Sequence, residues 1–155
     1  MQVRITDLEA GWLTLSLVHG EQAVELVASY LRDTPRELLE ALVRLLGGEP
    51  EARIFVEHEP DVSLLRLRML PGELLRIEVH GPGNDGPPPE PLGEPAFRHT
   101  EPAERFAARV LGEFDRLLRE GGEAGYERRW GLYPFPRRPY DALTHILCER
   151  GLRPG

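Results

Sequence analysis

Residues 51–80, EARIFVEHEPDVSLLRLRMLPGELLRIEVH, decide the fold because apolar side chains recur at every second position in three successive runs. Alternation of this kind predicts three strands, each with one apolar face. Short turns at 59–61 and 70–72 connect the runs, and Gly72 can adopt the positive φ that a three-residue hairpin loop needs. The stretch therefore predicts an antiparallel meander whose inward residues are Ile54, Val56, Ser63, Leu65, Leu67, Met69, Leu75, Ile77 and Val79.

The same register places four arginines on the opposite face of this meander. They are Arg53, Arg66, Arg68 and Arg76, and they share that face with Phe55, Leu64, Glu57 and Glu78. The favoured interpretation is a solvated face with cross-strand charge pairs, because surface charge usually serves solvation. The alternative is a docking face for an acidic ligand or partner segment. A pocket enclosed by the four arginines would support that alternative.

Three further alternating runs, at 2–6, 12–18 and 24–28, precede this stretch and predict a second three-stranded meander. In the middle run Leu13 begins the apolar face, and Trp12 falls on the other face. We expect the two meanders to form one curved sheet. Between them a helix is predicted over 35–47, with Thr34 as N-cap, Glu37 completing a capping box and two glycines ending the helix.

The C-terminal half is expected to be mainly helical. Residues 81–95 contain six prolines and four glycines, a composition that favours an extended or flexible loop. A short strand at 96–99 can follow. Apolar spacing of three and four residues then predicts helices over 102–120, 123–130 and 139–150. The whole chain, 1–155, is therefore expected to be a single α+β domain with helices packed on the sheet.

Residues 126–140, YERRWGLYPFPRRPY, hold five of the eleven aromatic residues together with four arginines and three prolines. Tyrosine, tryptophan and arginine dominate binding hot spots, but buried aromatic rings are also ordinary core components. The stretch is therefore either a strap that closes the core or a contact surface. Its outward candidates are Tyr133, Arg137 and Arg138, and burial of Trp130 would favour the strap.

No motif in the chain specifies a reaction. The five histidines show no metal-ligand spacing, and the one cysteine, Cys148, falls near a predicted helix C-terminus, where a packing role is favoured. Phosphate-binding and dinucleotide-binding fingerprints are absent from the sequence. We expect no catalytic residue, no metal and no cofactor.

Composition indicates the class of partner. A net charge of −7 argues against nucleic acid, and no apolar run is long enough for a membrane span. Without an export signal, the expected location is the cytoplasm. In general character the chain is similar to small bacterial antidote or adaptor proteins: acidic, motif-free and mixed α+β.

The leading hypothesis from the sequence is a non-enzymatic protein-binding module with a protein partner, for example an immunity- or antitoxin-like inhibitor of a basic protein. One alternative is a small-molecule enzyme or ligand-binding domain that grips an anionic ligand with the arginine-rich face. Another is a self-assembling structural component. The oligomeric state stays open.

Overall fold

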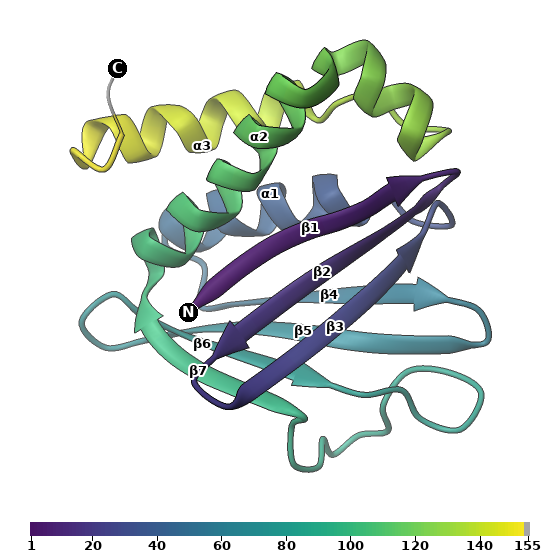
Figure 1. The fold of residues 1–155 in the computed structure, drawn as a ribbon. Helices are drawn as coiled ribbons and strands as arrows, with labels where there is room; N and C mark the ends of the chain where they lie inside the picture. Colours follow the sequence, from purple (N-terminus) through teal and green to yellow (C-terminus); the bar gives the residue numbers. More distant parts are fainter. Residues whose placement is uncertain (154–155) are drawn as a thin grey trace.

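The computed structural model describes residues 1–153, which form two antiparallel sheets and three helices (Figure 1). The first sheet has the order β1-β2-β3 and the second the order β4-β5-β6-β7. The α+β class and both meanders are confirmed. The elements are β1 Gln2–Glu9, β2 Trp12–His19, β3 Gln22–Ser29, α1 Thr34–Leu46, β4 Glu51–His58, β5 Asp61–Leu70, β6 Leu74–His80, β7 Phe97–Pro102, α2 Ala103–Trp130 and α3 Arg137–Glu149.

The meanders are separate sheets, so the expectation of one curved sheet is wrong. Helix α1 occupies the connection between β3 and β4, and the chain returns with its strands at an angle to those of the first sheet (Figure 1). The two edge strands meet through a side chain, because Ser29 Oγ donates a hydrogen bond to the Glu57 carbonyl at 3.0 Å. β7 extends the second meander to four strands.

The predicted inward face of the second sheet is confirmed. Leu65 pairs with Ile54 on one side and with Val79 on the other, and all three side chains are buried. The β5–β6 hairpin has the predicted loop length of three residues, displaced by one position to 71–73, because Leu70 still pairs with Leu74. Helices α1, α2 and α3 lie on one side of the two sheets, and the apolar core fills the space between (Figure 1).

The predicted N-cap of α1 is wrong. Asp33 holds that position, and Thr34 is the first helical residue, with its hydroxyl buried and without a hydrogen-bond partner in the described chain. Glu37 does not complete a capping box, because its carboxylate accepts a hydrogen bond from Arg32 at 2.7 Å. The C-terminal stop at Gly47 is confirmed.

Two predicted helices, 102–120 and 123–130, appear as one element, α2, interrupted where the sequence placed the break. Gly122 has φ 64° and ψ −174°, which is not helical, so the chain turns there. The helix begins one residue late because Pro102 still pairs with Leu74 in the sheet. α3 begins two residues earlier than the predicted 139.

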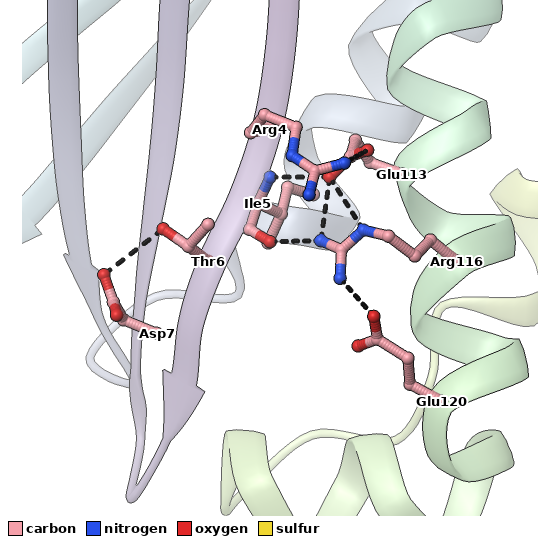
Figure 2. A network of polar contacts seen from close by, with 7 residues as sticks. All are labelled: Arg4, Ile5, Thr6, Asp7, Glu113, Arg116 and Glu120. Atoms are coloured by element: carbon pink, nitrogen blue, oxygen red, sulfur yellow. Dashed lines mark hydrogen bonds and ion pairs between the residues drawn. The ribbon is translucent and has the colours of Figure 1, made fainter.

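Two side chains of α2 hydrogen bond to the outer edge of β1 (Figure 2). Glu113 accepts the N–H of Ile5 at 2.9 Å, and Arg116 donates to the carbonyl of the same residue. Arg116 also donates to Glu113 at 2.8 Å and to Glu120 at 2.7 Å. We call this pair of side chains the edge clamp. It satisfies backbone groups that an edge strand otherwise leaves to water or to another strand.

Candidate functional site

An exposed apolar patch lies where the first sheet meets the C-terminal end of α2. Its four side chains come from the start of β2, the turn after β3 and the loop after α2. They are Trp12, Tyr30, Leu31 and Leu132, with 45, 42, 43 and 66% of their surface exposed. We call this group the apolar patch. Because exposed large apolar side chains on neighbouring segments can form an interaction site, this group is the candidate site.

Two glycines bring these segments together. The Gly11 N–H donates to the Arg129 carbonyl at 3.0 Å, and the Tyr30 N–H donates to the Gly11 carbonyl at 2.8 Å. A Cβ on Gly131 would lie 3.9 Å from the Cα of Gly11. The β1–β2 hairpin and the loop after α2 therefore lie side by side at the upper right of Figure 1, and Trp12 and Leu132 are the next residues along these two segments.

The aromatic stretch 126–140 closes the core. Trp130 and Tyr126 are fully buried, and the ring of Phe135 packs edge-on against Tyr126 at 5.3 Å and Tyr140 at 5.2 Å between centroids. Burial raises the pKa of the Tyr126 hydroxyl far above its usual value of 10. Only the outward residues of this stretch are available to a partner.

Arg137, one of the predicted contact residues, is engaged within the protein. It pairs with Glu123 and, at 3.4 Å, with Asp141. Its guanidinium carbon lies 5.2 Å from the ring centroids of both Phe135 and Tyr140. The hydrogen bond to Glu123 raises the pKa of Arg137 above its usual value. This arginine therefore braces the strap.

The other two predicted contact residues of the stretch lie in different places. Arg138 is exposed, makes no ion pair with residues 1–153, and lines a hollow of about 330 Å³ with Val43 of α1 and Ala142 of α3. Tyr133 is half-buried beside Trp130, with ring centroids 6.3 Å apart, and directly follows Leu132 of the apolar patch. Arg138 and Tyr133 thus have different neighbours.

The four predicted arginines of the second sheet share its outward face, and β7 adds Arg98 to them. Cross-strand pairing sets Arg53 beside Arg66, Arg66 beside Glu78, and Glu78 beside Arg98. In this row every guanidinium has an acidic partner: Arg66 contacts Glu51 and Glu78, and Arg98 donates to Glu78 at 3.0 Å. The arginines of this row form the cross-strand charge pairs that the favoured interpretation of the sequence expects.

The neighbouring row is different. Arg68 and Arg76 face each other across β5 and β6, between Glu51 on β4 and Thr100 on β7. Neither arginine makes an ion pair or hydrogen bond with any residue that the structure describes, and the Nε of each is shielded from solvent. Glu51 cannot neutralise them fully, because its carboxylate already contacts Arg66 and Arg53.

The Pro/Gly-rich loop 81–95 folds back against this outward face (Figure 1). Arg53 donates to Glu90 of the loop at 2.5 Å. Leu64 and His80 point outward by register and are nevertheless buried. Beside the β4–β5 hairpin the loop borders a hollow of about 730 Å³, lined by Glu57, Glu59, Pro60, Val62, Asp85, Gly86 and Pro87. The loop therefore leaves only part of the face open.

The remaining titratable groups of the described residues include one stacked histidine pair. Within 1–153 no three histidine, cysteine or acidic side chains are grouped so as to hold a metal ion. His19 and His99 stack with ring centroids 3.9 Å apart, and burial together with the neighbouring imidazole lowers the pKa of His99. None of the helices in this part of the chain is long and apolar enough to cross a membrane.

Comparison with protein-family models, with curated proteins and with solved structures finds no match for this chain.

Part of the candidate site can be inferred from sequence patterns. Trp12 falls on the polar face of its predicted strand, and Arg98 would continue the arginine-rich face once a seventh strand is assumed. The segments that carry Trp12 and Leu132 meet through a backbone hydrogen bond between Gly11 and Arg129, more than a hundred positions apart, so no local pattern reveals this arrangement.

Proposed function

We propose that this protein is a non-enzymatic binding module that docks a partner protein on the apolar patch. The observation that carries the proposal is the convergence of Trp12, Tyr30 and Leu132, from three separate segments, on one exposed tip. Tryptophan and tyrosine are the residues most enriched at binding hot spots. Because the Gly11 and Gly131 backbones hold the tip, docking requires little ordering of the patch.

The charges around the patch define the partner. Asp7, Glu9 and Glu127 are exposed near it and make no ion pair with residues 1–153. Of the arginines on the same segments, Arg32 is neutralised by Glu37 at 2.7 Å, whereas Arg128 and Arg129 make no ion pair with residues 1–153. Charges of both signs therefore lie near the patch, with three unpaired carboxylates against two unpaired arginines. The matching partner surface has an apolar centre and a rim with an excess of basic groups. This supports the hypothesis of an immunity- or antitoxin-like inhibitor that covers a basic site, since complementary charge speeds encounter and excludes wrong partners.

The test compares three proteins as bait in a lysate of the source cells: the wild type, a Trp12→Thr/Leu132→Ser variant, and a Leu74→Ser control. Leu74 is also exposed but belongs to the second sheet. We expect one basic protein to be retained by the wild type and by the control and lost with the patch variant. Titration of that purified protein should then show a loss of affinity of about tenfold or more for the variant.

Two results would overturn the proposal. In the first, the retained protein binds the patch variant as tightly as the wild type. In the second, the mass in solution shows a dimer that the Trp12→Thr/Leu132→Ser variant converts to a monomer, so that a second copy of the chain covers the patch. Trp12 is only 45% exposed, so the variant should unfold at a somewhat lower urea concentration than the wild type, and binding is compared under conditions in which circular dichroism shows the variant to be folded.

A further inference from the structure

We infer that Arg68 and Arg76 form a binding site for a phosphate group on the outward face of the second sheet. The inference is independent of the proposed function, because it rests on a different face of the molecule. It begins with a cost to the fold. Like charges placed directly opposite on neighbouring strands are destabilising, with Cβ atoms only about 5 Å apart. The pairing of Arg68 with Arg76 is such an arrangement.

The described residues do not offset this cost. Among residues 1–153, Arg68 and Arg76 have no acidic partner, and their Nε–H groups are shielded from water without an acceptor. A buried donor without a partner is itself destabilising. The other three arginines of the same face, Arg53, Arg66 and Arg98, all form ion pairs. An external acceptor at the terminal nitrogens of Arg68 and Arg76, which are not among the shielded atoms, would offset the repulsion between the two guanidinium groups.

The geometry favours a dianionic phosphate as that acceptor. Each guanidinium presents a planar fork of donors that binds two oxygens at once, and a phosphate has enough oxygens for both forks. Its charge of nearly −2 balances two arginines, whereas a carboxylate balances one. Thr100, an exposed residue with a hydroxyl group, continues the same cross-strand row. Leu74, exposed two residues before Arg76, offers apolar contact to an organic group attached to the phosphate.

The test follows the arginine Nε–H signals of the purified protein by NMR while inorganic phosphate replaces chloride at constant ionic strength. We expect the signals of Arg68 and Arg76 to shift saturably and those of the paired Arg98 to stay in place. Methyl phosphate should give the same response. Acetate should bind at least about tenfold more weakly, as expected when one charge-assisted hydrogen bond is lost.

Two variants separate binding from folding. Arg68→Gln/Arg76→Gln should abolish the phosphate response of the Thr100 amide, while Arg98→Gln, on the same face, should keep it. Without phosphate the double variant should be at least as stable to urea as the wild type, because the repulsion is gone. The inference is overturned if the Arg68 and Arg76 signals do not respond to phosphate, if acetate binds equally well, or if the double variant is less stable and retains the Thr100 response.

Discussion

The indole N–H of Trp130 donates a hydrogen bond to Asp33 Oδ1 at 3.1 Å and so joins the last residue of α2 to the residue before α1. A buried indole needs such a partner, and here the partner is a partly buried carboxylate. Burial raises the pKa of Asp33 above its usual 3.8, against the opposing effect of the Trp130 hydrogen bond. The hydrogen bond satisfies the buried indole, but it requires the ionised Asp33 carboxylate to be partly removed from water, which is unfavourable.

Replacing Asp33 with asparagine should keep the acceptor for Trp130 and remove that charge. A carboxyl with a raised pKa is penalised in the folded protein when it is ionised. The penalty is therefore absent below pH 3.8 and complete above the folded-state pKa. We expect Asp33→Asn to gain stability relative to the wild type as pH rises through this window, measured by urea unfolding.

Asp33→Ala is the matched control for this prediction. It removes the charge and also the acceptor, so the indole N–H of Trp130 is left unpaired, at a cost of about 1–3 kcal/mol. The interpretation would be wrong if Asp33→Asn and Asp33→Ala lowered the free energy of unfolding equally, or if the asparagine variant lost stability relative to the wild type with rising pH.

Removing Glu113 should open the edge of β1. Burial raises the pKa of the Glu113 carboxyl, but the hydrogen bonds from Arg116 and the Ile5 N–H outweigh it and hold the pKa below 4.5. In Glu113→Ala the Ile5 N–H loses its acceptor, while Arg116 keeps Glu120 and the Ile5 carbonyl, so we expect a loss of about 1–3 kcal/mol in urea unfolding. The amide of Ile5 should also exchange faster with deuterium. Glu120→Ala, which removes the more exposed partner of Arg116, should cost less than about 1 kcal/mol. Equal losses in the two variants would argue against the edge clamp.

The elements that the sequence predicts well depend on local rules. Alternation set the faces of Leu65 and Ile77 because a residue on a pleated strand points to the side opposite its neighbour. The break at Gly122 followed from the conformations open to glycine. Both patterns involve only neighbouring residues, so they do not depend on contacts with distant parts of the chain.

The features that the sequence did not reveal depend on partners far along the chain. Thr34 looked like an N-cap, but tertiary contacts placed Asp33 there and turned it toward Trp130. The division into two sheets depends on where α1 packs. The strand register predicted that all four arginines of the arginine-rich face point outward. Which of the four have acidic partners depends on where folding places the carboxylates of Glu51, Glu78 and the loop residue Glu90.

Substituting Gly11 with alanine should destabilise the tip that carries the apolar patch. Gly11 has φ +80°, and a Cβ there would lie 2.6 Å from Cδ1 of Tyr30. An alanine would be strained by its backbone and would also displace the Tyr30 ring, for a total of about 1–2 kcal/mol in urea unfolding. Gly20→Ala is the control, since φ is +58° there but no atom lies within 4 Å of the added Cβ. If both variants lost the same stability, close packing at the junction would have no part in the effect.

Acid should weaken the contact between the two sheets through His99. This ring stacks on His19 of the first sheet, and Glu101, Arg109 and the N-terminal amine are the other charges that act on it. Burial and the charge of His19 lower its pKa below 6.5, so the folded protein takes up this proton less readily than the unfolded chain. Stability from this site is therefore complete above pH 6.5 and is lost as pH falls through the folded-state pKa.

Urea unfolding at about pH 7.5 and about pH 5 should show the wild type losing more stability than His99→Gln, whereas exposed His145→Gln should follow the wild type. A His99→Gln variant as acid-sensitive as the wild type would assign the acid sensitivity to other groups.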